Sequence, residues 1–177
     1  LTRSDLMLDW LDNHRNQAGS PNENYAREFW ELYTLGPLDP ITGLPNYTET
    51  DIQQASRAFT GWERYDPVQN PSDSYYSRFN QSRHDGGNKN VLGYIGPWKD
   101  EDIVDITLTR PRAADFICEN LFRFFAYENP DIALVQSLSQ ILTSNGWELR
   151  PVIETILKSE AMFSGAALRE RVKAPTE

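Results

Sequence analysis

Charged side chains recur at intervals of four residues in the segment SPNENYAREFWELYTLG, at Glu23, Arg27 and Glu31. Residues four apart lie on one face of a helix, so the spacing predicts a row of carboxylate, guanidinium and carboxylate. On a solvated surface, each such pair contributes only about 0.3–0.5 kcal/mol. If the row is instead buried, it either holds neighbouring loops or belongs to a site, because unpaired buried ions are costly.

A second polar block, RHDGGNK, places His84 beside Asp85 and puts Lys89 after a pair of glycines. Histidine is the side chain best suited to proton transfer near neutral pH. Adjacent residues of a strand point to opposite faces, so His84 and Asp85 form a direct pair only if the chain bends there. The alternative interpretation is a hairpin turn in which Asp85 caps backbone N–H groups. The sequence is compatible with both interpretations.

These blocks supply the groups that a glycoside hydrolase requires, namely two carboxylates about 5–10 Å apart across a cleft. Aromatic side chains near loops could stack on sugar rings, and arginine or lysine could pair with carboxylates. In the block YTETD, Thr48 with Asp51 instead indicates a capping box. The candidate catalytic residues are Glu23, Glu31, His84 and Asp85, and the candidate binding residues are Arg27, Arg57, Lys89 and Trp62.

Several classes of function are disfavoured. The chain has two histidines and one cysteine, without H-E-x-x-H, C-x-x-C or calcium-loop spacing, so we predict no metal site from these motifs. Only a calcium or magnesium site built by carboxylates of distant segments stays open. A nucleophile elbow and a phosphate loop are also missing from the sequence, and no cofactor is expected. The single Cys118 lies on an apolar helical stripe and is expected to be an inert core thiol.

Composition limits the partners. The net charge of −9 disfavours nucleic acid, whose phosphates require a basic face. No apolar run approaches the roughly 20 residues of a membrane span.

The elements that must position these residues are mostly helices. Apolar spacing with Gly, Pro and capping residues at the boundaries predicts them over 4–17, 22–35, 48–61, 100–109, 112–127, 131–144 and 148–163. A β-hairpin is predicted over 75–96, with HDGGNK as its turn, in a loop and hairpin insertion over 63–98. The expected core includes Met7, Trp10, Leu11, Tyr25, Ala26, Phe29, Trp30, Leu32, Tyr33, Ile52, Ala55, Phe59, Phe116, Leu121, Phe124, Ile132, Val135, Leu138, Leu142, Val152, Ile156 and Leu157.

The predicted fold class is therefore mainly α, a multi-helix bundle-like domain with a small β-hairpin insertion. The length suits one helical domain over residues 1–177. Because the chain begins without a methionine, we expect it to be a fragment of a larger protein.

Six blocks in order carry a family resemblance: MLDWLDN, PNENYAREFWELYTLG, YTETDIQQASRAFTGW, RHDGGNKNVLG, FICENLFRFF and VKAPTE. Together they resemble the C-terminal part of the bacterial domain of unknown function 1800 (DUF1800) family. The set is specific, and it covers nearly all of the chain. The resemblance implies a mainly helical protein that is often exported, so we expect an extracytoplasmic location, periplasmic or secreted. It implies no assigned activity.

Two hypotheses about function follow. The first is a non-catalytic binding or assembly module for a protein or a cell-surface polymer such as a polysaccharide, since no recognised catalytic motif is present. The second is a polymer hydrolase that acts on carbohydrate through Glu23, Glu31 or Asp85 with His84. The enzyme hypothesis predicts that these residues converge on one open cleft.

Overall fold

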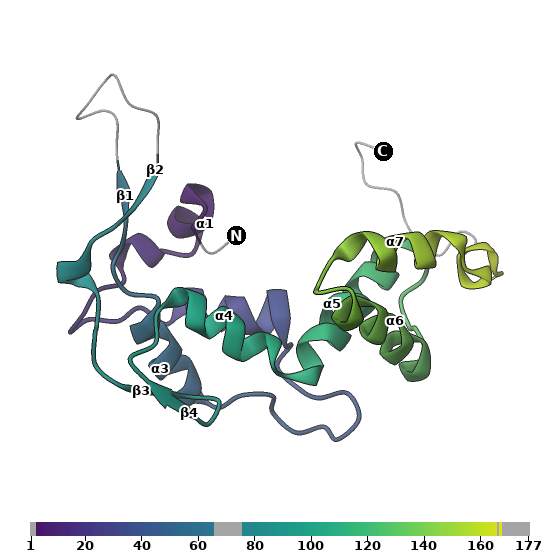
Figure 1. The fold of residues 1–177 in the computed structure, drawn as a ribbon, viewed down its shortest axis with the longest axis horizontal. Coiled ribbons are helices and arrows are strands. Elements are labelled where there is room, and N and C mark those ends of the chain that lie inside the picture. The colour runs from purple at the N-terminus through teal and green to yellow at the C-terminus, as the bar shows by residue number, and fades with distance from the viewer. Residues whose placement is uncertain (1–2, 66–75, 166, 168–177) are drawn as a thin grey trace. The chain divides into compact units, whose positions relative to one another are not determined.

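The computed structural model describes residues 3–65, 76–165 and 167 (Figure 1). Part of the predicted insertion, including Tyr75, and the terminal VKAPTE block lie outside the described residues. Within the described residues the fold is mainly helical with two small antiparallel sheets, which confirms the predicted fold class. The chain divides into two compact units, residues 1–109 and 110–177. The prediction of one domain over the whole chain stays a prediction.

The first unit begins with a helix that is shorter than expected. Helix α1 spans Asp5–Trp10 and is followed by the 3-10 turn η1, Asn13–Arg15. A left-handed Asp12 (φ 55°) separates the two, so the helix predicted over 4–17 is interrupted. Leu8 and Leu11 are buried, whereas Trp10, expected in the core, is 80% exposed.

The helix predicted over 22–35 contains a change of helix type. An α-helix, α2 (Asn24–Glu28), continues as the π-helical turn η2 (Phe29–Thr34) and ends at Gly36, whose φ is +70°. Trp30 is fully buried, and its indole N–H donates to Thr107 at 2.9 Å. The wider turn shifts the later side chains relative to α-helical spacing. Leu32, expected in the core, is accordingly 57% exposed.

Helix α3 (Glu49–Ala58) is the element against which the predicted polar blocks pack. It begins with the capping box anticipated at Thr48 and Asp51: the Asp51 N–H donates to the Thr48 hydroxyl oxygen at 3.1 Å, and the Thr48 N–H donates to the Asp51 carboxylate at 2.9 Å. The predicted apolar face is buried, with Ile52 and Ala55 at 0% exposure. The helix contacts α2 and β3.

The strands pair differently from the prediction. Strand β1 (Trp62–Tyr65) pairs with β2 (Tyr76–Phe79), and β3 (Lys89–Val91) pairs with β4 (Tyr94–Gly96). The prediction that 75–80 would pair with 90–96 around HDGGNK is therefore wrong. The actual turn of the second hairpin is Leu92-Gly93, both with positive φ. Alternation in short polar segments does not specify a partner strand, because register depends on which face is buried.

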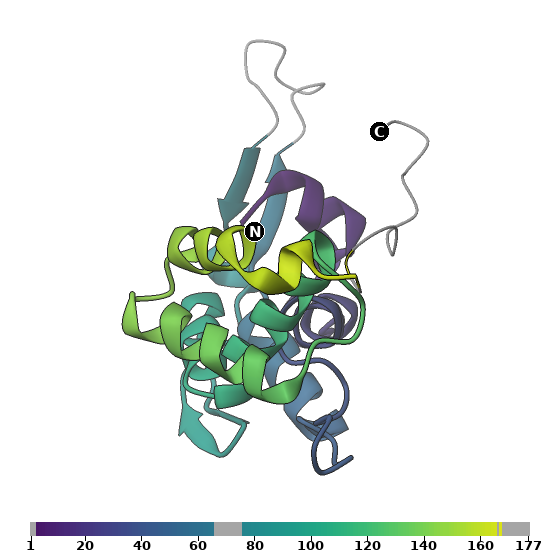
Figure 2. The same cartoon turned by 90° about the vertical axis from the view of Figure 1, so that its right-hand side faces the viewer.

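Helix α4 (Asp100–Leu108) completes the first unit, and the second unit is built from α5 (Pro111–Phe125), α6 (Ile132–Ser144), α7 (Leu149–Lys158) and the 3-10 turn η5 (Glu160–Phe163). Figure 2 shows α5, α6 and α7, in green to yellow, packed side by side. Their buried core is Ala114, Cys118, Phe122, Ala126, Val135, Leu138, Leu142, Val152 and Ile156.

The apolar stripes of the second unit lie slightly out of phase with the predicted ones. Phe124, Ile132 and Leu157 were expected in the core, but they are 54%, 49% and 42% exposed. In α5 the buried stripe runs through Cys118 and Phe122, and the repeated aromatics of the segment made the phase ambiguous. Cys118 is buried, as predicted for a core thiol. Burial raises the pKa of this thiol to about 11.

Candidate functional site

The C-terminal end of α3 and the RHDGGNK segment form one polar cluster, here called the Arg57 cluster (Arg57, Thr60, His84, Asp85 and Lys89). The Arg57 guanidinium donates two hydrogen bonds to the Asp85 carboxylate, at 2.7 and 3.1 Å. It also donates to the carbonyl of Asn88 at 3.2 Å and to the side chain of Gln54 at 2.8 Å. The adjacent guanidinium lowers the pKa of Asp85 below its usual value. The arginine therefore holds the glycine-rich segment against the helix.

Thr60 and His84 form the inner part of this cluster, and their contacts fix the histidine tautomer. The Thr60 hydroxyl donates to the carbonyl of Arg57 at 2.6 Å and accepts from the Asp85 N–H at 2.8 Å. His84 Nδ1 lies 3.0 Å from the carbonyl oxygen of Thr60, which can only accept. The network thus assigns the proton of the neutral ring to Nδ1. His84 Nε2 is buried and has no hydrogen-bond partner among the described residues.

Lys89 is 1% exposed and serves as an internal cation of the segment. Its ammonium group donates to the backbone carbonyls of Asp85 and Gly87, the latter at 3.0 Å. Burial lowers the pKa of Lys89 below its usual value. A lysine used for proton transfer would have to reach a substrate, whereas this one is directed into the loop backbone.

The buried lysine has a measurable consequence above neutral pH. Between its lowered pKa in the folded chain and the ordinary value near 10.4, the unfolded chain binds more protons. The contribution of Lys89 to the free energy of unfolding therefore rises with pH in that window. We expect the wild-type protein to gain stability relative to Lys89→Met in urea unfolding as the pH rises toward the ordinary lysine value near 10.4. Lys158→Met, at a lysine whose side chain is 78% exposed, is the control. A difference between Lys89→Met and wild type that stays constant with pH would contradict this expectation.

The charged row on α2 forms a second cluster. Arg27 makes a bidentate pair with Glu49 of α3, at 2.9 and 2.7 Å, and a weaker contact of 3.4 Å with Glu23. Its described partners do not include Glu31, because α-helical spacing ends at Glu28 where the π turn begins. The Glu49 side chain is 70% exposed, so the pair is a surface ion pair and the alternative of a shielded row is wrong. The hydrogen bonds between the two side chains raise the pKa of Arg27 and lower the pKa of Glu49.

The described contacts do not bring the predicted catalytic residues together. Arg27 pairs with Glu49 at the start of α3, and Asp85 pairs with Arg57 near its end. Glu49 and Arg57 are eight residues apart, which is about 12 Å along the helix axis. No described hydrogen bond or ion pair joins Glu23 or Glu31 to His84 or Asp85. Glu31 instead lies near Tyr47, whose phenol pKa is raised to about 12 by burial first and by that carboxylate second.

A metal site is not indicated in the described part of the chain. No group of three or more His, Cys, Asp or Glu side chains is placed there to hold an ion. The carboxylate of Asp85, which follows His84 in the chain, is already paired with Arg57. The arrangement can therefore position a loop, and each charge within it already has a protein partner.

Trp62, predicted as a binding aromatic, lies in a cross-strand contact. Its ring meets Phe79 edge-on, with centroids 5.4 Å apart, and the Arg3 guanidinium lies 5.0 Å above it. Phe79 in turn contacts the His84 ring at 5.4 Å. The half-buried Trp62 thus packs beside the Arg57 cluster as part of its apolar support, rather than displaying its ring to a ligand.

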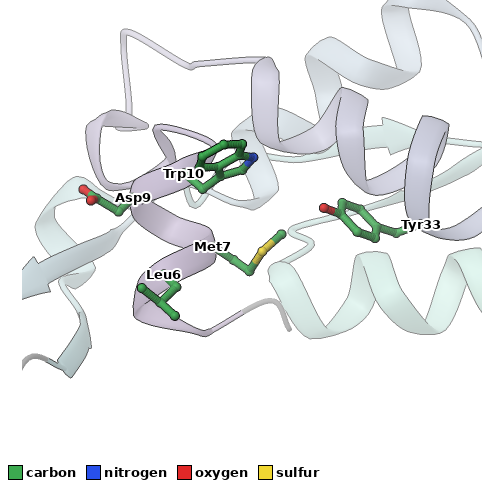
Figure 3. Close-up of a pocket in the computed structure, with 5 residues that line it drawn as sticks. All are labelled: Leu6, Met7, Asp9, Trp10 and Tyr33. Carbon is green, nitrogen blue, oxygen red and sulfur yellow. The ribbon is translucent and has the colours of Figure 1, made fainter. Parts of the chain in front are cut away.

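A surface pocket that the sequence did not single out lies between α1 and η2 (Figure 3). Its lining residues are Leu6, Met7, Asp9, Trp10 and Tyr33. Met7 and Tyr33 point toward one another from the two elements, whereas Asp9 points away and pairs with Arg64 at 2.8 Å. Leu6 and Trp10 are 81% and 80% exposed. We call this the α1 pocket.

The sequence pattern predicted a buried face at α1 and gave no indication of the α1 pocket. Trp10 lies at helical spacing with Met7 and Leu11, which favours a core assignment for that stripe. Tyr33 was also expected in the core but is 39% exposed, because the π turn directs it to the pocket. No local pattern in the sequence distinguishes such a turn from an α-helix. Thr60 is central to the Arg57 cluster, but a lone threonine has no distinctive spacing that would mark it in the sequence.

None of the helices in the described residues is long and apolar enough to cross a membrane. No curated protein and no solved structure matches the chain. One family does, under the description "Protein of unknown function (DUF1800)", over residues 1–177. The match covers the whole chain, in agreement with the six sequence blocks, and so this protein belongs to the DUF1800 family.

Proposed function

We propose that this chain is a bacterial, extracytoplasmic binding or assembly module whose partner is a protein. The observation that supports it best is the α1 pocket, where Leu6 and Trp10 present most of their surface to solvent. Exposed aromatic and aliphatic side chains gathered at a pocket mark interaction sites, and tryptophan and tyrosine dominate binding energies. The π turn that places Tyr33 there is a feature that recurs at functional sites.

The charged residues support binding better than catalysis. A general acid or base must be able to meet a substrate, yet Asp85 is held by Arg57 and Lys89 is directed to backbone carbonyls. The hydrolase hypothesis requires two carboxylates facing one cleft, and Glu23 and Asp85 belong to separate clusters. The extracytoplasmic location rests on the family, whose members are often exported, and cell fractionation of the source bacterium tests it.

Selection from a random peptide library tests the proposed function. We expect the immobilised chain to enrich peptides that bind wild type and lose binding to Trp10→Ala, because the indole is the largest exposed group in the pocket. Phe163→Ala, which removes an aromatic side chain that is 79% exposed in the second unit, is the matched control and is expected to bind normally. Enrichment no better than on an unrelated protein, or co-sedimentation with purified cell-wall polysaccharide instead, would refute a protein partner.

A further inference from the structure

The distribution of charge over the two units indicates what kind of segment the α1 pocket receives. Residues 1–109 contain 17 acidic and 9 basic side chains, a net charge of −8 out of −9 for the whole chain. The unit that carries the pocket is thus strongly acidic, whereas the second unit is nearly neutral. The net charge of this unit attracts a cationic partner over long range, which favours a cationic surface in the encounter.

The pocket lining indicates the apolar half of the ligand. Met7 has a flexible, polarizable side chain that adapts to other side chains, and Leu6 adds an aliphatic surface. Sugar rings require polar groups to bind their hydroxyls, and the one carboxylate here, Asp9, is turned away and paired with Arg64. The exposed face of Trp10 suits both an apolar side chain and, by cation–π attraction, a lysine or arginine beside it.

The net charge of residues 1–109 also makes a second copy of the chain a poor ligand for the α1 pocket. Two copies that met through their α1 pockets would bring two acidic units together, each with net charge −8. Like charges that face one another across an interface oppose association. Charge complementarity therefore favours a different molecule with the opposite sign.

We infer that the α1 pocket binds a basic amphipathic segment of a partner protein, with an apolar side chain seated among Leu6, Met7, Trp10 and Tyr33 and with lysine or arginine around it. This inference rests on the proposed function and deepens it by naming the partner's chemistry. Apolar contact at the pocket supplies specificity, while the charge of residues 1–109 supplies attraction. Binding by such a segment must therefore depend both on Trp10 and on salt.

Two synthetic peptides with the same leucine pattern, one with lysine and one with glutamate at the polar positions, test the inference by calorimetry on the full chain. We expect the lysine peptide to bind, to weaken as salt is raised, and to weaken about tenfold or more with Trp10→Ala. A scrambled lysine peptide of equal charge, without an apolar face, is expected to bind no better than background. Phe163→Ala should leave the affinity unchanged.

Four other results of these experiments would overturn the inference. Equal binding of the scrambled peptide, or binding of the lysine peptide that Trp10→Ala leaves intact, would overturn the inference, since attraction would then be charge alone. Preference for the glutamate peptide, or Trp10-dependent self-association in analytical ultracentrifugation, would also overturn it. In those cases the proposed function survives if library peptides still require Trp10, and it fails if no such peptide is selected or if the chain co-sediments with cell-wall polysaccharide instead. Because Trp10 is 80% exposed, its removal is not expected to unfold the chain, and Leu6→Ala serves as a second variant.

Discussion

Gly61→Ala is expected to lower the free energy of unfolding by about 3 kcal/mol, through backbone strain and overpacking together. Gly61 has a φ of +100°, which an L side chain rarely adopts. An added Cβ would lie 2.9 Å from the ring of Phe79, 3.0 Å from the Cβ of His84 and 3.2 Å from the carbonyl oxygen of Asn80. The last of these is backbone, which cannot move aside without disturbing the segment that carries the Arg57 cluster. Urea unfolding followed by circular dichroism measures the loss.

Two other glycines separate the causes of this loss. Gly43 has a φ of +70° but nothing within 4 Å of an added Cβ, so Gly43→Ala reports strain alone and should cost about 1 kcal/mol. Gly86 has an ordinary φ and open space, so Gly86→Ala should change stability little. If Gly61→Ala were no more destabilising than Gly43→Ala, the close packing around Gly61 would not be as described.

Arg57→Ala is expected to lower the free energy of unfolding by about 2–3 kcal/mol. Loss of the guanidinium removes two donors from the carboxylate of Asp85, which keeps the N–H of Gly87, and removes the arginine donor from the carbonyl of Asn88. Removing one partner of a fully buried pair costs about 3–5 kcal/mol, and the smaller value here reflects side chains that are 27% and 21% exposed. Arg57→Lys should recover only part of the loss, since an ammonium cannot make the bidentate contact.

The matched control for Arg57→Ala is Arg27→Ala. Arg27 also makes a bidentate pair, but its partner Glu49 is 70% exposed, so its loss should have a much smaller effect. A double-mutant cycle with Asp85→Asn isolates the Arg57 pair. Because the folded-state pKa of Asp85 is lowered, its contribution is present above the ordinary value near 3.9 and is lost as the pH falls through the folded value. Equal losses for Arg57→Ala and Arg27→Ala would show that the Arg57 cluster does not hold the segment.

The candidate residues illustrate what local patterns reveal about a site. The blocks that contain Arg57, His84, Asp85 and Lys89 were recognisable as unusual, and the structure joins all four in one cluster. The pairing of Arg57 with Asp85 was not predictable from the sequence, because an ion pair between residues 28 positions apart leaves no periodic pattern. Glu23 and Glu31 were selected by α-helical spacing alone, and the π turn at Phe29 removes that spacing for Glu31.

The sequence alone determined the class of the fold, the positions of most helices, the Thr48–Asp51 capping box and membership of the DUF1800 family. These follow from local chemistry: apolar periodicity, capping residues, glycine and proline act within a few neighbours along the chain. Strand pairing, the phase of the buried stripes and the exposure of Trp10 were decided only in the tertiary structure. Each depends on which surfaces meet, and burial of long-range partners overrides local preference there.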